Sequence, residues 1–152
     1  MAIRNIVKRG DDTLKKVCRP VTDFDTRLHT LLDDMHDTVV AADGAGLAAP
    51  QVGVLRRAVL VIDGDDFLEL INPEIIETKG EQIEAEGCLS VPGIYGTVSR
   101  PAYVKVRAQD RFGEWFEVEG EELAARAFCH EIDHLNGTLF TDKVIEYLEE
   151  EK

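Results

Sequence analysis

The sequence has few cysteines, no long apolar run and no signal-like start, and each shortage excludes a class of protein. An odd number of cysteines at wide spacings does not suit a disulfide framework and favours a reducing compartment; the three are Cys18, Cys88 and Cys129. No apolar run approaches the roughly 20 residues that span a bilayer. The first ten residues lack the apolar core of a secretory signal. We therefore expect a cytoplasmic protein.

Basic residues are also scarce relative to acidic ones. The chain has 30 acidic residues against 17 Lys and Arg residues, which gives a formal net charge of −13 at pH 7. Binding to a phosphate backbone or to an anionic membrane surface requires a basic face, so neither nucleic acid nor membrane is an expected partner. The 152 residues contain no repeat and no Pro/Gly/Ser-rich linker. A single domain over residues 1–152 is the expected organisation.

Apolar residues at helical spacing predict a long helix over residues 23–42. Thr22, followed by Asp25 three positions later, resembles a capping box at its start. Gly44 is suited to end the helix in a left-handed conformation. The apolar positions that define this pattern are Phe24, Leu28, Leu31, Leu32, Met35 and Val39.

The middle of the chain is predicted to be rich in strands. A second helix is expected over residues 121–136, closed by Gly137, and a short C-terminal helix over residues 142–150. Helices at both ends with strands between them favour an α+β fold over a parallel βαβ fold. Short apolar or alternating runs predict the strands, at residues 58–62, 67–71, 83–86, 104–108 and 115–118.

The second predicted helix carries the segment His130–His134, HEIDH. Histidines at positions i and i+4 lie about 40° apart on one helix face, so both imidazoles can reach one metal ion. Leu123 and Ala127 share that arc, which indicates that the face points inward. Glu131 projects to one side of the pair, a position suited to a general acid/base acting on a water molecule at the ion. The alternative is a pair of core histidines, each satisfied by a hydrogen bond.

Two ligands are too few for a tight site, so a third is expected. A histidine ten residues after His130 would suit one group of metalloproteases, but that position is Phe140. Glu146 or Glu149 could act as a downstream carboxylate ligand after a tight return of the chain. These alternatives leave the cysteines as the remaining soft donors.

The three cysteines differ in their surroundings. Cys129 projects away from His130 and, like Cys18, is interpreted as a buried core thiol. Cys88 follows a predicted strand and a flexible glycine, Gly87. A thiolate there would favour Zn or Fe(II) over Mg or Ca and, with two imidazoles, would leave a fourth position open for water.

Three segments, in this order, resemble the motifs of the peptide deformylase family. Residues 44–51, GAGLAAPQ, resemble GxGLAAxQ; residues 86–90 match EGCLS; residues 130–134 match HExDH. The resemblance covers essentially the whole chain. It implies antiparallel sheets packed around a central metal-binding helix, with a long N-terminal helix and a short C-terminal helix.

The resemblance also implies an activity, a cofactor and a partner. The activity is hydrolysis of the N-formyl group of formyl-methionine at the start of a newly made polypeptide, with release of formate. The cofactor is one divalent metal ion, Fe(II) in the cell, with Zn, Ni or Co also accepted. The partner is the N-formylmethionyl nascent chain at the ribosome of a bacterial cytoplasm.

Residue roles follow from the same resemblance. Cys88, His130 and His134 would hold the ion, and Glu131 would move the proton. The Gln51 amide and the Leu89 backbone N–H would stabilise the oxyanion, unless Gln51 is only a turn residue that bonds to backbone. Apolar walls suit the thioether of methionine. The residues expected to line its pocket are Ala45, Gly46, Gly87, Leu123 and Ala127.

Two further expectations concern the surroundings of Cys88. Glu86 is expected to pair with a base such as Arg100 and brace this segment, the alternative being an exposed acid. The following residues, 91–96, carry no arginine where certain members of the family have one. Selectivity beyond the first substrate residue therefore stays open.

Two rival functions remain to be separated from this one. An HExxH peptidase would use Glu146 or Glu149 as its third ligand and cleave internal peptide bonds. A binding module with a structural zinc would close the site with four protein ligands, of which only three good candidates are found.

Overall fold

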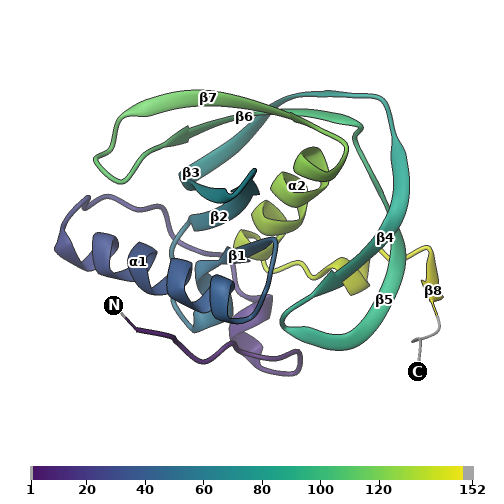
Figure 1. Ribbon diagram of the computed structural model, residues 1–152, viewed down its shortest axis with the longest axis horizontal. Helices are drawn as coiled ribbons and strands as arrows, with labels where there is room; N and C mark the ends of the chain where they lie inside the picture. The colour runs from purple at the N-terminus through teal and green to yellow at the C-terminus, as the bar shows by residue number, and fades with distance from the viewer. Residues whose placement is uncertain (1, 149–152) are drawn as a thin grey trace.

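The computed structural model describes residues 2–148 and contains two antiparallel sheets and two α-helices (Figure 1). The order of strands in the five-stranded sheet is β1-β2-β3-β6-β7, and in the three-stranded sheet β4-β5-β8. The helices are α1 (Thr26–Ala41) and α2 (Leu123–Leu135), and the expected α+β fold with antiparallel sheets is confirmed. The strands are β1 (Gly46–Ala48), β2 (Ala58–Asp63), β3 (Asp66–Lys79), β4 (Gln82–Cys88), β5 (Val91–Arg100), β6 (Tyr103–Gln109), β7 (Trp115–Glu121) and β8 (Glu146–Leu148).

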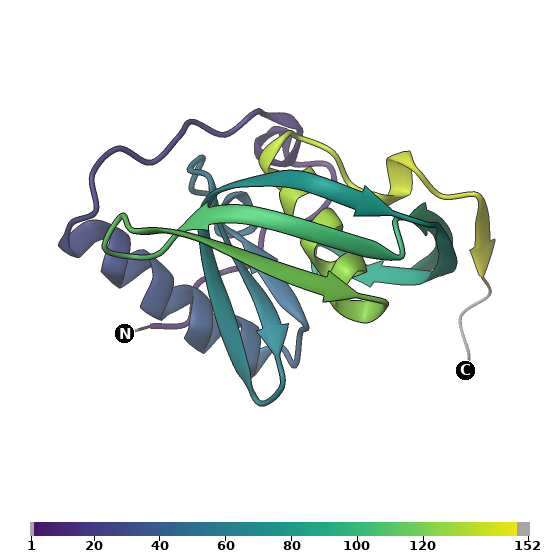
Figure 2. The same cartoon turned by 90° about the horizontal axis from the view of Figure 1, so that it is seen from above.

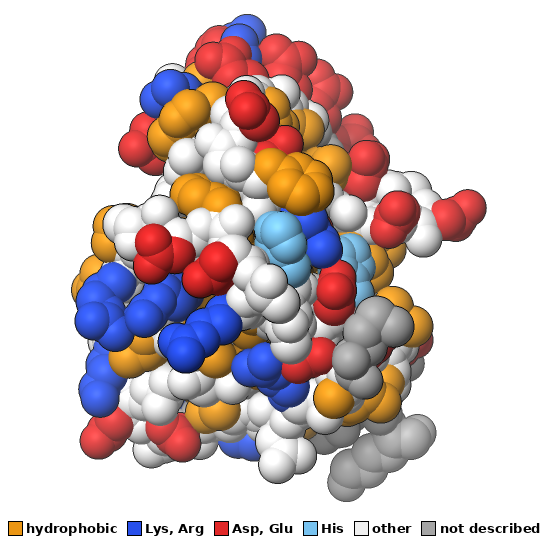
Figure 3. All heavy atoms as spheres, turned by 90° about the vertical axis from the view of Figure 1, so that its left-hand side faces the viewer, with side chains coloured by type: hydrophobic (Ala, Val, Ile, Leu, Met, Phe, Trp, Pro, Cys, Tyr) orange, Lys and Arg blue, Asp and Glu red, His pale blue; other side chains and the backbone are white. Residues whose placement is uncertain are grey.

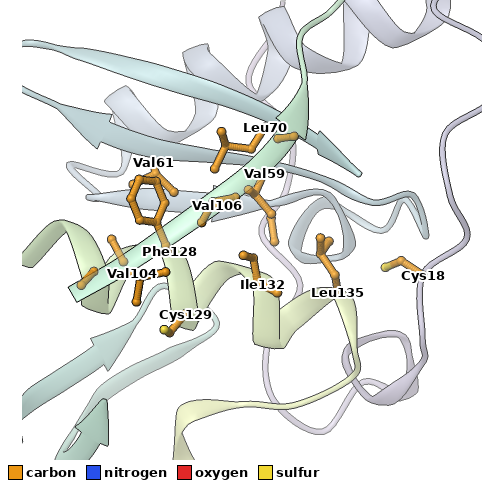
Figure 4. Packing of buried hydrophobic residues seen from close by; sticks show 14 residues of the cluster. Cys18, Val59, Val61, Leu70, Val104, Val106, Phe128, Cys129, Ile132 and Leu135 are labelled. Atoms are coloured by element: carbon orange, nitrogen blue, oxygen red, sulfur yellow. The ribbon is translucent and has the colours of Figure 1, made fainter. Parts of the chain in front are cut away.

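The two helices cover opposite faces of the five-stranded sheet. Successive side chains of a strand point to opposite faces. In β2, Val59 and Val61 belong to the core cluster formed with α2, whereas Ala58 and Leu60 belong to the cluster formed with α1. This double burial explains why β2 is a continuous apolar run without alternation. Figure 4 shows the α2 side of the core, where Phe128, Ile132 and Leu135 face valines and Leu70 of the sheet.

The structure places the ends of both helices differently from the expectation. Helix α1 is capped by Asp25, whose side chain accepts a hydrogen bond from the Leu28 N–H at 3.2 Å, so Thr22 is not its cap. Asp43, rather than Gly44, takes the left-handed conformation after it, with φ 56°. Helix α2 begins at Leu123, because Glu121 still belongs to strand β7.

The predicted C-terminal helix is wrong within the described part of the chain. Residues Phe140–Asp142 form a single 3-10 turn, and Glu146–Leu148 form strand β8, which pairs with β5. An unpaired edge of β5 offers backbone hydrogen bonds that outweigh a weak helical preference. Positions 149 and 150 of the predicted helix lie outside the described residues. Helix α1 and strand β8 lie at opposite ends of the molecule (Figure 2).

Charge is unevenly distributed over the surface. On the face seen in Figure 3, lysine and arginine side chains gather on one side, apart from a group of acidic side chains at the upper end. In the described part of the chain, no helix has both the length and the apolarity needed to cross a membrane.

Candidate active site and metal centre

Three side chains from two elements converge on one point. Cys88 ends strand β4, and His130 and His134 lie one turn apart on α2. One donor atom from each residue lies within 4.8 Å of the other two, and the Cys88 Sγ is 3.3 Å from the His134 Nε2. Both histidines are buried and Cys88 is half-buried. The structure therefore brings together the three side chains that the sequence singled out as metal ligands.

The competing third ligands lie elsewhere. Within residues 2–148, the group of Cys88 with the two histidines is the one cluster of this kind, and it does not include Glu146, which is exposed on β8. Glu149 lies outside the described residues. At the position of the rejected third histidine, Phe140 stacks on the His130 ring, with 6.0 Å between the ring centroids.

The other two cysteines are buried core residues, as expected. Cys18 and Cys129 both belong to the core cluster between α2 and the five-stranded sheet (Figure 4). Burial raises the pKa of both thiols, which keeps them protonated and poor metal ligands.

Glu86 holds His130 in place, and the expected pair with Arg100 is confirmed. Glu86 is buried, with 5% of the residue exposed, and its carboxylate accepts two hydrogen bonds of 2.9 Å from the Arg100 guanidinium. Its Oε1 lies 3.0 Å from the His130 Nδ1, which leaves the Nε2 of His130 for a ligand. Burial raises the pKa of Glu86, but hydrogen bonds with His130 and Arg100 outweigh it and hold the pKa at about 2.

Two members of this network were not predicted from the sequence. Arg126 donates to Glu86 from α2, and Arg100 also donates to Asp133 at 2.6 Å. The spacing of Arg126, His130 and His134 at intervals of four residues was the available signal. Asp133, the fourth residue of the HEIDH segment, thus connects α2 to β5 through Arg100 and does not belong to the donor cluster.

Glu131 occupies a buried position beside this cluster. Its residue is 5% exposed, and its Oε1 has no hydrogen-bond partner within the described part of the protein. Burial raises the pKa of Glu131 to about 7, a value suited to accepting and returning a proton near neutral pH. A Cβ added at Gly46 would lie 2.7 Å from the Glu131 Oε2 and 2.9 Å from the Leu60 carbonyl oxygen. Only glycine therefore allows edge strand β1 to approach this carboxylate.

Gln51 reaches the cluster from the short turn after β1. Its Oε1 accepts a hydrogen bond from the Ala48 N–H at 2.9 Å, so it does bond to backbone. Its Nε2 points the other way and donates to the Ser90 Oγ at 3.1 Å and to the Cys88 Sγ at 3.5 Å. Leu89 follows Cys88 in the turn between β4 and β5, and its side chain packs on Gly44.

A cleft of about 480 Å³ opens beside these residues. Leu123 is 64% exposed, so the expectation that its helix face points inward is wrong at this first position and it lies at the rim. Tyr95, which was not predicted, packs so closely on Gly87 that an added Cβ would lie 2.6 Å from its ring. The cleft is lined by all five residues predicted to form the pocket: Ala45, Gly46, Gly87, Leu123 and Ala127.

The charges of the site call for a cation. Burial lowers the pKa of His134 to about 3, so this imidazole is neutral and its lone pair is available. Burial also lowers the pKa of His130, but the charge of Glu131 and hydrogen bonds with Cys88 and Glu86 raise it to about 10. The negative groups around His130 thus favour positive charge at this point. A divalent cation fits the same place, because the donors are one thiol and two imidazoles.

A buried carboxylate beside a cluster of two histidines and a cysteine, at the side of an apolar cleft, defines the class of metal-dependent hydrolases. The polypeptide deformylase family matches residues 3–150. A peptide deformylase from Acetivibrio thermocellus is 59% identical over 152 residues, which cover all of this chain and 89% of that protein.

Solved structures agree with the sequence relatives. The crystal structure of a peptide deformylase from Legionella pneumophila is similar with a TM-score of 0.91 and 49% identity, over 94% of this chain and 86% of that one. That of the Thermotoga maritima enzyme has a TM-score of 0.92 and 41% identity, over 95% and 99%. The chain belongs to the polypeptide deformylase family. It is a metal-dependent hydrolase of protein biosynthesis that removes the N-formyl group from the formyl-methionine of newly made polypeptides and releases formate.

Proposed function

We propose that Cys88, His130 and His134 hold one divalent ion and that Glu131 is the general acid/base of deformylation. The observation that carries this proposal is the buried Glu131 Oε1 without a protein partner in the described chain, beside three donor atoms within 4.8 Å of one another. A divalent ion held there acts as a Lewis acid and lowers the pKa of water. Glu86 orients His130 through its Nδ1, and Arg100 keeps that carboxylate charged.

Glu131 takes up one proton from water and later gives it to the leaving amine. The carboxylate accepts a proton from the attacking water as its oxygen bonds to the formyl carbon. It then delivers that proton to the amine nitrogen as the C–N bond breaks, which gives formate and a free amino terminus. Burial matches its pKa, about 7, to both steps. Because Gly46 lets the backbone approach the Glu131 Oε2, the carboxylate has little room to move away.

The Gln51 amide and the Leu89 backbone N–H stabilise the oxyanion that forms on the formyl group. The Gln51 Oε1 is anchored by the Ala48 N–H, and this bond orients its Nε2 toward the site. The 3.5 Å contact between the Nε2 and the Cys88 Sγ is the weaker of its two donations. Substrate would replace that contact and leave the bond to Ser90 in place.

The cleft receives the methionine side chain of the substrate. Apolar contacts for this side chain come from five residues that line the cleft together with Glu131: Ala45, Gly46, Gly87, Leu123 and Ala127. Strand β1 is an edge of its sheet, so its backbone is available to pair with an extended peptide.

We also propose Fe(II) as the ion used in the cell, with Zn, Ni or Co able to replace it, because thiolate and imidazole suit these metals. The proposed substrate is met as a nascent chain at the ribosome, in the cytoplasm. In this arrangement α2, which contacts β1, β2, β6 and β7 on one side and β5 on the other, serves as the central helix of the site.

Formate release tests the proposal. Protein purified anaerobically with Fe(II) or Ni(II) is incubated with formyl-Met-Ala-Ser, with acetyl-Met-Ala-Ser as the control for general deacylation. We expect stoichiometric formate and free Met-Ala-Ser from the first peptide only. Cleavage between residues, seen by mass spectrometry, would favour the peptidase instead. Full metal loading without turnover would favour a structural metal and overturn the proposal.

A further inference from the structure

Arg126 is a buried cation in the wall of the cleft. It lies on α2 one turn before His130, is 5% exposed, and lines the cleft beside Ala127 and Gly87. The methylene stem of an arginine can form an apolar wall while its guanidinium bonds elsewhere. A permanent charge is costly to bury without partners, so the distribution of its five N–H groups shows what the side chain is built to do.

Most of the guanidinium is tied to the three-stranded sheet. The Nη1 donates to the Glu86 carboxylate, to the Val98 carbonyl at 3.2 Å and, more weakly, to the Glu84 carbonyl at 3.4 Å. The Nη2 donates to the Gln82 Oε1 at 3.4 Å. These bonds fix the guanidinium between α2 and strands β4 and β5.

The Nε–H of Arg126 differs from these groups. It has no hydrogen-bond partner among residues 2–148. In that part of the chain, the fully buried side-chain atoms without partners are the Glu131 Oε1 and the His134 Nδ1, so the Arg126 Nε retains access to solvent. The cleft is the hollow that this side chain lines. Since Arg126 lines the cleft, its stem and Nε–H are the part of this side chain that is not tied to the three-stranded sheet.

We propose that the Arg126 Nε–H donates a hydrogen bond to the thioether sulfur of the substrate's methionine and thereby selects methionine over apolar side chains of the same length. The inference rests on the proposed placement of that side chain in the cleft. A thioether is a weak acceptor, and a charged donor strengthens such a bond. An apolar wall alone separates side chains of equal size poorly, whereas a positioned donor discriminates against the analogue that lacks the acceptor.

The test compares formyl-Met-Ala-Ser with formyl-norleucine-Ala-Ser, in which a methylene replaces the sulfur. The metal-loaded enzyme is expected to favour the methionine peptide about 3- to 10-fold in kcat/KM, the size of one net hydrogen bond. The difference should lie in KM, because the contact is remote from the reacting carbon and is made equally before and during the reaction. In Arg126→Lys and Arg126→Met the ratio should fall to about 1.

A matched control separates this role from a structural one. Arg100→Lys removes a guanidinium from the same Glu86 carboxylate, yet Arg100 does not line the cleft. It should slow both peptides equally through Glu86 and His130 and leave their ratio as in the wild type. Metal content and melting temperature are measured for each variant.

Three outcomes would overturn the inference. They are equal kcat/KM for the two peptides in the wild type, a ratio unchanged in both Arg126 variants, or a ratio lost equally in Arg100→Lys. The comparison of the methionine and norleucine peptides in the wild type can still refute the inference if neither Arg126 variant folds. No formate from either peptide would instead overturn the proposed function, and with it the selectivity.

Discussion

Three side chains from β5 and α2 converge on the carboxylate of Glu86, and its loss should destabilise the protein. The carboxylate accepts hydrogen bonds from Arg100 on β5 and from Arg126 on α2, and it contacts the His130 Nδ1. Glu86→Gln keeps the size of the side chain and removes its charge. Two buried guanidinium groups would then face a neutral amide, and breaking a buried pair on one side is among the more damaging substitutions.

The pKa of Glu86 sets the magnitude of the loss. A carboxyl whose pKa falls from 4.5 to about 2 on folding contributes about 3 kcal/mol to the free energy of unfolding. For a chain of this length that corresponds to a melting temperature roughly 6–12 °C lower. Because the folded pKa is the depressed one, the contribution is fully present above pH 4.5 and disappears as the pH falls toward 2.

Thermal unfolding followed by circular dichroism between pH 7 and pH 2 measures this contribution. Metal is removed from both proteins beforehand, so that the release of metal in acid does not change the measured stability. The gap in stability between wild type and Glu86→Gln should be constant above pH 4.5 and close below it. Glu84→Gln, an exposed acid on the same strand, is the matched control and should show almost no gap. A gap below about 1 kcal/mol at pH 7, or one that persists at pH 2, would refute the reasoning.

Four other predictions concern the site itself. Glu131→Gln should lower kcat by ~10²–10⁴-fold while metal analysis shows full loading; near-wild-type turnover would remove Glu131 from the mechanism. Cys88→Ala should lose the ion, so that dialysed protein contains less than the wild type by elemental analysis, whereas Cys129→Ala should retain it. Gly46→Ala should cost on the order of 10²-fold in kcat/KM, because its Cβ would meet the Glu131 Oε2 at 2.7 Å; unchanged activity would mean that this carboxylate tolerates displacement. A strong chelator should abolish formate release, and added Fe(II), Ni(II) or Zn(II) should restore it; activity that survives complete metal removal would contradict the metal site.

Strand positions could be predicted where side chains alternate or form one apolar run. Strand β6 shows strict alternation of burial, and β2 is apolar throughout because helices cover both of its faces. Strand β5 was missed because Pro92, Gly93 and Gly96 disfavour an interior strand. It forms because β4 turns back sharply after Cys88 and supplies a complete antiparallel partner, a non-local cause that local sequence does not contain.

The candidate site was accessible from the sequence to the extent that its residues lie close together in the chain. Helical spacing alone places His130 and His134 on one face, and the glycine before Cys88 singles out that cysteine. Arg126 has the same spacing, but an arginine on a helix is usually exposed, so only the partner across the interface shows that it is buried.

The position of Cys88 relative to the two histidines depends on polar contacts more than on the apolar core. Strand β4 supplies no buried residue to the core cluster of α2, which is formed with the five-stranded sheet. Polar contacts join β4 to α2: Glu86, two residues before Cys88, contacts His130 and Arg126, and Arg126 also makes longer bonds to Gln82 and to the Glu84 carbonyl. Removing one partner of such a buried network is costly, and the network's hydrogen bonds also restrict how β4 and α2 can sit against each other. The carboxylate that orients His130 therefore also sets how far the Cys88 sulfur lies from it, and Glu86→Gln should weaken metal binding by about 10- to 100-fold even where the protein remains folded.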